Sequence, residues 1–160
     1  MVSRVNLKPE MCGAHILVRP VTADEALPIR AEVLRPGLML SVAAYAGDAH
    51  PEAYHAGAFF SGNLIGVATV FPDMPLESEN PLAWRLRGMA VQDAFHGLGV
   101  GRTLLGHCID HVAEMGGNLL WCYARTVVLE FYRVMGFQPL GDEFVIPVSG
   151  PHYFMVRKVP

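Results

Sequence analysis

Three alternating glycines precede a predicted helix and could bind an anion. Gly97, Gly99 and Gly101 are separated by single residues, so the backbone can approach a ligand without an intervening Cβ atom. Apolar side chains then recur at helical spacing over residues 102–115. The first N–H groups of a helix lack intrahelical partners and lie at the positive end of its dipole. These residues therefore predict a phosphate-binding loop at a helix N-terminus.

Two common phosphate-binding loops do not match these residues. A Walker A loop requires G-x-x-x-x-G-K-[ST], and no Gly-Lys pair occurs near the glycines. A dinucleotide-binding loop requires G-x-G-x-x-G in the first strand–helix unit. Counted from Gly97 or Gly99, the third glycine position holds Arg102 or Leu104, and the loop lies late in the chain. The spacing therefore argues against both classes.

A third loop type fits, and it carries a resemblance to a known family. The run His96-Gly-Leu-Gly-Val-Gly101 follows a predicted strand that ends in Met89-Ala-Val91. It resembles the Q/R-x-x-G-x-G/A signature of the GCN5-related N-acetyltransferase (GNAT) family. Downstream, Tyr132-Arg-Val-Met-Gly-Phe137 resembles the Y-x-x-x-G-F segment of the same family. The order and spacing of the motifs match that family, and the resemblance covers about residues 14–159.

The resemblance implies acetyl-coenzyme A (acetyl-CoA) as a co-substrate. Backbone groups near Met89 would hold its pantetheine arm and acetyl carbonyl, in a gap between this strand and the one ending at Tyr123. Loop N–H groups over 97–103 would hold its pyrophosphate. His96 stands where the family has Gln or Arg, and Arg125 where many members have a cofactor-contacting asparagine. The predicted cofactor-binding set is Met89, Ala90, Val91, His96, Gly97, Leu98, Gly99, Val100, Gly101, Arg102, Thr103, Arg125 and Tyr132.

Tyr132 is the predicted catalytic residue. Acetyl transfer from a thioester to an amine releases a thiolate, and the resemblance implies that the Tyr132 hydroxyl protonates it. An ordinary tyrosine pKa of ~10 and a thiol pKa of ~8.5 make this transfer reasonable. The alternative interpretation is that Tyr132 is a core aromatic side chain on an amphipathic helix.

The acceptor amine lacks an evident base. Many family members carry a glutamate base on the strand before the loop, and the matching position holds Arg85, which cannot accept a proton at neutral pH. The amine is therefore deprotonated through water or by another residue, or it arrives neutral. Arg85 and Arg87 share one side of the strand, which suits a substrate carboxylate or phosphate. Solvated edge charges are the alternative. His152 is a further candidate beside the acceptor.

Periodicity and turn residues predict how these residues are positioned. Thr22 and Glu25 form a capping-box pattern for a helix that ends before Pro36. We expect a single GNAT-like α/β (α+β) domain over residues 1–160, with a core over about 14–159 and a mixed sheet of six to seven strands with helices on both faces. Strands are predicted at 15–20, 54–60, 64–71, 83–91 and 118–123, with two more within 137–159. Further helices are predicted at 102–115 and 126–135. The secondary structure of residues 38–46 is ambiguous, with a short helix as one interpretation.

Composition narrows the range of partners. The net charge of −3 and the absence of a basic run give no reason to expect nucleic acid. No apolar run approaches the ~20 residues of a spanning helix, and a signal-peptide core is missing, so we expect no membrane and a cytoplasmic location. No metal is expected. His107 and His111 have the spacing of metal ligands but lie on the predicted solvent face of their helix.

The predicted function is an acetyl-CoA-dependent N-acetyltransferase that transfers acetyl directly to the amine of a small molecule, with amino acids and peptides included. A non-catalytic acyl-CoA binding or sensing module is the alternative, because the glutamate base is missing. A nucleotide-phosphate binder is a third hypothesis. The sequence does not determine whether a longer acyl chain is used. It also leaves the oligomeric state undetermined, with a homodimer through the tail hairpin as one hypothesis.

Overall fold

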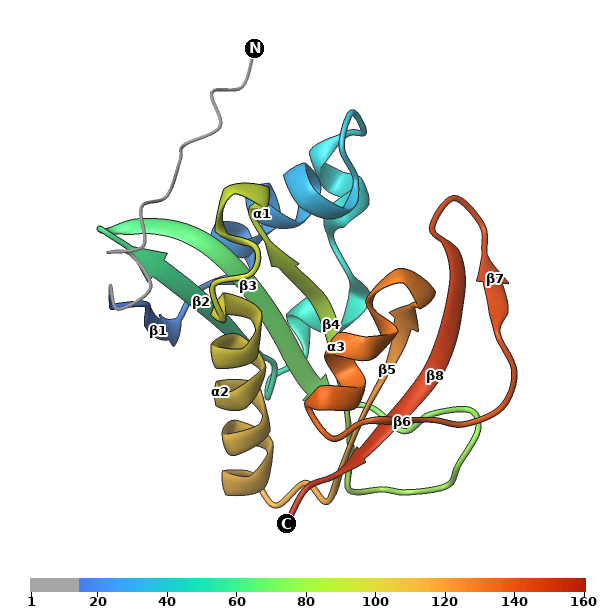
Figure 1. Cartoon of the computed structure of the whole chain (residues 1–160). Coiled ribbons are helices and arrows are strands. Elements are labelled where there is room, and N and C mark those ends of the chain that lie inside the picture. Colours follow the sequence, from blue (N-terminus) through green and yellow to red (C-terminus); the bar gives the residue numbers. More distant parts are fainter. Residues whose placement is uncertain (1–14) are drawn as a thin grey trace. The chain divides into compact units, whose positions relative to one another are not determined.

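A computed structural model of the protein describes residues 15–160 (Figure 1). Of the three cysteines in the sequence, Cys12 lies outside the described residues. Its strands are β1 (Leu17–Pro20), β2 (Tyr54–Phe60), β3 (Asn63–Pro72), β4 (Ala83–Val91), β5 (Leu119–Arg125), β6 (Gln138–Pro139), β7 (Phe144–Ile146) and β8 (Gly150–Lys158). Its helices are α1 (Ala23–Leu34), α2 (Val100–Glu114) and α3 (Leu129–Val134), with the 3₁₀ turns η2 (Leu40–Ala43), η3 (Ala46–Ala49), η4 (Asp93–Phe95) and η5 (Thr126–Val128).

The first helix starts as the sequence predicts, and the strands predicted at 54–60 and 64–71 are joined by a tight turn. The Glu25 N–H donates to the Thr22 hydroxyl, and the Thr22 N–H donates to the Glu25 carboxylate, both at 3.1 Å. This capping box fixes the start of α1. Between β2 and β3, Ser61 and Gly62 have φ values of 49° and 79°. Positive φ at both central residues is the type I′ geometry that matches the twist of paired strands.

Three predicted segments differ in detail. The ambiguous segment 38–46 and the residues after it form η2 and η3 instead of an α-helix. The helix predicted over 126–135 is a 3₁₀ turn, η5, followed by the six-residue α3. The tail contains three strands instead of two, because β6 and β7 both pair with β8.

The strands form a mixed sheet in the order β1-β2-β3-β4-β5-β8-β6, with β7 also paired to β8. β4 and β5 are parallel, whereas β1 with β2 and β5 with β8 are antiparallel. The predicted fold class is confirmed. The described residues contain eight strands where six to seven were predicted, and the extra strand comes from the two short tail segments.

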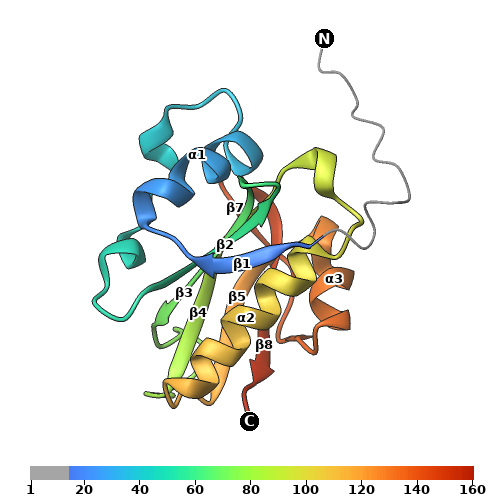
Figure 2. The same ribbon diagram turned by 90° about the vertical axis from the view of Figure 1, so that its left-hand side faces the viewer.

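The chain divides into two compact units, and the first contains α1 and the glycine loop. Of the described residues it comprises 15–69 and Gly88–Cys108. Val67 of β3 packs in an apolar cluster with Ala26 and Ile29 of α1. The preceding residue of β3, Gly66, faces α2, since a Cβ atom there would lie 3.0 Å from Leu104. Neighbouring strand residues point to opposite faces, so α1 and α2 cover opposite faces of this unit (Figure 2).

The second unit comprises Val70–Arg87 and Ile109–Pro160. One face of its strands carries Ala83, Trp121 and Phe154, which are buried together. β5 and β8 lie side by side along their length, and β7 adds to the outer edge of β8 (Figure 1). The predicted single domain over residues 1–160 stays a prediction.

Candidate active site

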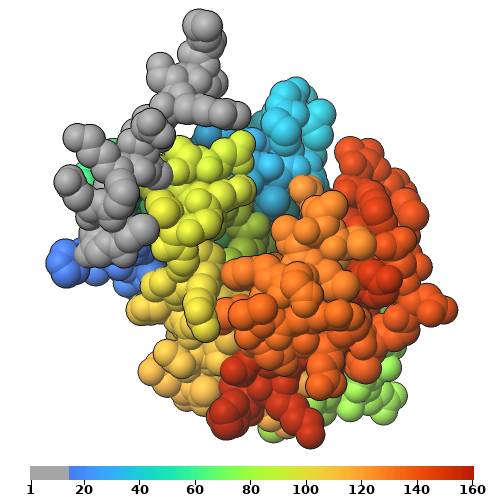
Figure 3. Space-filling view, in the orientation of Figure 1, coloured from blue at the N-terminus to red at the C-terminus, as the bar shows by residue number. Residues whose placement is uncertain are grey.

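The glycine loop forms an open cradle at the start of α2. Gly97 and Gly99 have φ values of 76° and 81°, a backbone conformation that favours glycine. Apart from the glycine itself and its two chain neighbours, no heavy atom of the described residues lies within 4 Å of a Cβ atom built on either glycine. The Thr103 N–H donates to the Gly99 carbonyl at 3.0 Å, so N–H groups before Thr103 lack a partner within the helix. The segment around residue 100 lies at the surface (Figure 3, yellow).

The helix itself begins inside the predicted loop. Val100 and Gly101 form the first residues of α2, and Val100 is buried. Arg102 and Thr103 follow with exposed side chains, and Leu98 is half-buried. The predicted phosphate-contacting residues are therefore the last loop glycines and the first helical turn, which is the arrangement that binds anions through backbone N–H groups.

The exposed His96 side chain bonds the loop to the end of β4. Its Nε2 lies 2.7 Å from the Val91 carbonyl oxygen at the end of β4. Because a carbonyl can only accept, Nε2 donates, and in the neutral ring Nδ1 is then an acceptor. A neutral His96 thus offers a phosphate no donor other than the one bound to Val91. His96, which stands where the family has Gln or Arg, thus links the glycine loop to Val91 at the end of β4.

The pairing of β4 with β5 ends before β4 reaches the loop. In the second unit the parallel register of β4 and β5 contains three pairs, from Ala83 with Leu119 to Arg85 with Trp121. Beyond it, Gly88 has a φ of 65°, which interrupts regular strand geometry. Ala90 is buried against the α1 cluster, and Met89 and Val91 are half-buried.

Tyr132 of α3 packs edge-to-face against two phenylalanine rings. It is 8% exposed, and its ring centroid lies 5.2 Å from that of Phe131 and 5.4 Å from that of Phe137. Gly136, with a φ of 91°, ends the helix and places Phe137 beside the tyrosine. Arg125 pairs with His152 in the register of β5 and β8. The packing that the alternative interpretation requires is therefore present.

Arg85 is held between aromatic rings of the second unit. Its guanidinium carbon lies 4.7 Å from the Trp121 ring centroid and 5.2 Å from that of Tyr123. Asp73 is its charged partner, at 3.7 Å. Burial, followed by the hydrogen bond to Glu77, raises the pKa of Tyr123. Arg85 is thus not a solvated edge charge. Arg87 is half-buried.

His152 has a local structural partner. It is 4% exposed, and its Nδ1 lies 2.6 Å from the Gly150 carbonyl oxygen, to which it donates. Its ring lies 6.1 Å from that of Phe144. These contacts fasten the turn between β7 and β8.

A buried polar network in the first unit was missed by sequence reasoning. Arg30 of α1 is fully buried and donates to both carboxylate oxygens of Asp48, at 2.7 and 2.8 Å. It also donates to the Thr69 hydroxyl at 2.6 Å, and His55 Nδ1 lies 2.7 Å from the same hydroxyl. The Tyr45 ring lies 4.8 Å from the guanidinium. We call these five residues the Arg30 network. It fastens η3 onto α1 and the strands.

Two groups in the network have shifted pKa values. Burial works to raise the pKa of Asp48, but the hydrogen bonds from Arg30 and the Tyr45 N–H outweigh it and lower that pKa. Burial first, and the Arg30 charge second, lower the pKa of His55. The one feature of the sequence that pointed to this network was Arg30, a charged residue among the apolar positions of α1.

His55 is expected to make stability fall at mildly acidic pH. Its pKa is below the ordinary 6.5 when folded. The unfolded chain then binds the proton more readily, so the contribution of His55 is present above pH ~6.5 and is lost as the pH falls below it. Thermal melts from pH ~7.5 to ~5 should show a smaller drop in Tm for His55→Gln than for the wild type. The exposed His107→Gln is the control, and an unchanged pH slope in His55→Gln contradicts this assignment.

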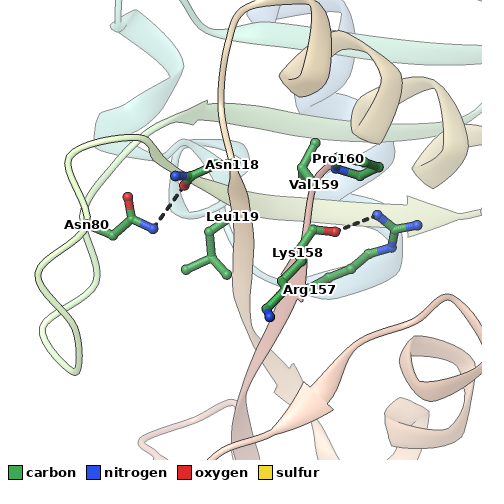
Figure 4. Close-up of a pocket in the computed structure, with 7 residues that line it drawn as sticks. All are labelled: Asn80, Asn118, Leu119, Arg157, Lys158, Val159 and Pro160. Carbon is green, nitrogen blue, oxygen red and sulfur yellow. Dashed lines mark hydrogen bonds between the residues drawn. The ribbon is translucent and has the colours of Figure 1, made fainter.

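An open depression in the second unit is lined by other residues. It has a volume of about 700 Å³ and is lined by Asn80, Asn118, Leu119, Arg157, Lys158, Val159 and Pro160 (Figure 4). Asn80 donates to Asn118 at 2.9 Å across its rim. None of the predicted cofactor-binding or catalytic residues lines it.

Two other classes of feature, a metal site and a membrane-spanning helix, are absent from residues 15–160. No group of three His, Cys, Asp or Glu side chains there is placed to hold a metal ion. In the same range no helix has the length and apolar character needed to cross a membrane. His111, predicted on the solvent face, is instead half-buried against the Trp84 ring at 5.8 Å, and burial lowers its pKa.

Comparison with known proteins decides the family. The profile described as Acetyltransferase (GNAT) family matches residues 23–137. The chain belongs to the GNAT family. YitI of Bacillus subtilis, named an uncharacterized N-acetyltransferase, is 34% identical over 141 residues, or 88% of this chain and 94% of YitI. N-alpha-acetyltransferase RimI of Mycobacterium tuberculosis is 30% identical over 114 residues, or 69% of this chain and 68% of RimI.

A solved structure agrees on the fold of this GNAT protein. An aminoglycoside 6'-N-acetyltransferase complexed with coenzyme A superposes with a TM-score of 0.72 at 14% identity, over 90% of this chain and 97% of that one. The predicted GNAT membership and the predicted N-acetyltransferase class are confirmed.

Proposed function

We propose that this GNAT protein transfers acetyl from acetyl-CoA directly to the amine of a small-molecule or peptide acceptor. The supporting observation is the open space around Gly97 and Gly99, the positive-φ glycines that come directly before the first turn of α2 and its N–H groups without partners in the helix. A diphosphate needs such donors and tolerates no Cβ atom close to the backbone. The family membership and the coenzyme A complex of the similar structure agree with this choice of anion.

In this proposal the donor is held mainly by backbone. The predicted pyrophosphate contacts are the N–H groups over 97–103, with Arg102 and Thr103 side chains beside them. Met89 and Val91 would hold the pantetheine arm, since the register of β4 with β5 ends at Arg85. His96 orders the loop through its bond to Val91. Leu98, Val100 and Arg125 remain proposed neighbours of the cofactor.

The proposed transfer needs one acid, Tyr132, and a water molecule to return its proton. The lone pair of the neutral amine attacks the thioester carbonyl carbon, and the C–S bond breaks. Tyr132 gives its hydroxyl proton to the departing sulfur, and the proton lost by the new amide nitrogen returns to Tyr132 through water. Arg85 takes no part as a base, because a guanidinium stays protonated. The products are the N-acetylated acceptor and free coenzyme A.

Acetyl-CoA is expected to raise the Tm of the protein by about 5–10 °C at a hundredfold excess over its Kd. ATP and NAD should give no comparable shift. Gly99→Ala should lose the shift, because its Cβ atom would occupy the cradle. Gly116→Ala is a matched control, since Gly116 also has a positive φ, 83°, and open space around it. A shift with ATP or NAD, or a full shift in Gly99→Ala, contradicts the proposal.

The compartment and the assembly remain predictions. We keep the cytoplasm and a homodimer through the tail hairpin as expectations. Binding of acetyl-CoA without turnover of any amine would favour the alternative, a non-catalytic binding or sensing module, for which Arg85 in place of glutamate is the supporting observation.

A further inference from the structure

The Arg85 side chain is largely buried, and its Nε atom lacks a hydrogen-bond acceptor in the described part of the chain. It is 17% exposed, and its Nε is buried with no hydrogen-bond partner among the described residues. Asp73 lies 3.7 Å from its nearest guanidinium nitrogen, which is beyond hydrogen-bond distance. Burying a charge without such bonds is costly. The site therefore has an unmet need for an acceptor of hydrogen bonds.

Two fixed aromatic rings set the orientation of the guanidinium. Trp121 Nε1 donates to the Asp73 carbonyl at 2.8 Å, and the Tyr123 hydroxyl donates to Glu77 at 3.0 Å. These bonds fasten the rings beneath the loop that joins β3 to β4. Rings that pack against a guanidinium leave its edge donors available, and those donors match a carboxylate in a planar fork.

A purely structural role accounts poorly for this arrangement. A pair at 3.7 Å whose acid, Asp73, has a 39% exposed side chain contributes little to stability. An apolar side chain could pack on Trp121 and Tyr123 without burying a charge. The carboxylates of Asp73 and Glu77 also favour a singly charged ligand over a phosphate, because they would repel a dianion more strongly.

We propose that Arg85 binds a carboxylate of the acceptor, so that the substrates are amino acids, or peptides with a free carboxyl end. This inference rests on the proposed acetyl transfer. The ligand carboxylate would accept from the guanidinium edge in place of the distant Asp73. Arg85 then determines specificity and takes no part in proton transfer.

The test compares amines that differ only in the carboxyl group. We would measure coenzyme A thiol release with ω-amino acids, from glycine to 6-aminohexanoate, and with the matching carboxamides. The wild type should prefer the carboxylate of the best pair. Arg85→Met should raise the KM for that carboxylate by about 10- to 100-fold while changing the KM for the carboxamide by no more than about twofold. Arg85→Lys should have a KM for the carboxylate between those of the wild type and Arg85→Met.

Two further variants separate specificity from structure. Asp73→Asn removes the competing carboxylate and should lower the KM of the amino acid by about threefold or more. Arg19→Met is the matched control, since Arg19 also lies over an aromatic ring, 4.0 Å from the Phe59 centroid, but on β1. If Arg85→Met does not fold, Arg85→Lys and Asp73→Asn carry the test.

The outcomes distinguish the two proposals. Equal turnover of carboxylate and carboxamide by the wild type, or an equal loss of both in Arg85→Met, overturns the role of Arg85 and leaves acetyl transfer intact. If no amine is acetylated, acetyl transfer fails instead. The role of Arg85 is then judged by thermal shift with 6-aminohexanoate. A rise in Tm that Arg85→Met abolishes supports it, and no rise in the wild type overturns it.

Discussion

Tyr132→Phe is expected to lower kcat for acetyl transfer by about 10²- to 10⁴-fold, the usual contribution of a positioned acid. The KM for acetyl-CoA should stay within about threefold of the wild type, because the proton is delivered only as the thiolate leaves. Phenylalanine keeps the ring contacts with Phe131 and Phe137, so stability should change little. The measurement is steady-state thiol release with a saturating amine.

Tyr153→Phe is the control for this prediction, since Tyr153 is a half-buried tyrosine of β8 outside the proposed machinery. A Tyr132→Phe enzyme with kcat within about threefold of the wild type would contradict the acid role. Tyr132 would then be what the alternative interpretation describes, a core aromatic side chain.

The described cysteines support direct transfer over an acetylated cysteine. Cys108 and Cys122 are buried, and burial raises the pKa of each thiol to about 12. Only the thiolate is an effective nucleophile, and it is scarce at neutral pH for such thiols. The acceptor amine is therefore the group that we expect to attack the thioester.

Arg30→Met is expected to reduce the free energy of unfolding by about 3 kcal/mol, the lower end of the cost of breaking a buried ion pair. The lower end applies because the side chain of Asp48 is 13% exposed, whereas that of Arg30 is fully buried. The substitution leaves the Asp48 carboxylate without its two short hydrogen bonds and removes a donor from Thr69. Urea denaturation at neutral pH measures the loss.

The double variant Arg30→Met with Asp48→Leu tests the cause. It should lose less than Arg30→Met, because no uncompensated charge remains in the network. Arg19→Met, which removes an exposed arginine, should change the free energy of unfolding by no more than about 0.5 kcal/mol. A loss below about 1 kcal/mol in Arg30→Met would show that the network does not hold η3 in place.

Local signals predicted the elements that local chemistry determines. The capping box at Thr22 fixes a helix start through bonds three residues apart, and Gly116 and Gly136 end helices through positive φ. Ser61 and Gly62 fix the register of the hairpin in the same way. These features depend on neighbours in sequence, so local chemistry is enough to determine them.

Contacts between distant segments were not predictable in this way. Arg30 meets Asp48 and Thr69 from other elements, and nothing around Arg30 in the sequence reveals either partner. The packing of Arg85 on Trp121 and Tyr123 depends on the register of β4 with β5. β6 and β7 are two and three residues long, too short for a periodic pattern.

The same difference, between features set by sequence neighbours and side-chain contacts, applies to the candidate site. The glycine spacing predicted the cradle, and the loop geometry agrees with it. The bond from His96 to Val91 and the contact of His152 with Gly150 could not be read from residue type, because both histidines were equally compatible with ligand contact.

Mass analysis of an amine incubated with acetyl-CoA, together with coenzyme A thiol release, tests the central claim most directly. The account predicts that an amino acid or peptide gains one acetyl group for each thiol released, and that Tyr132→Phe slows both equally. Tight acetyl-CoA binding with no acetylated product across small amines, amino acids and peptides would contradict it.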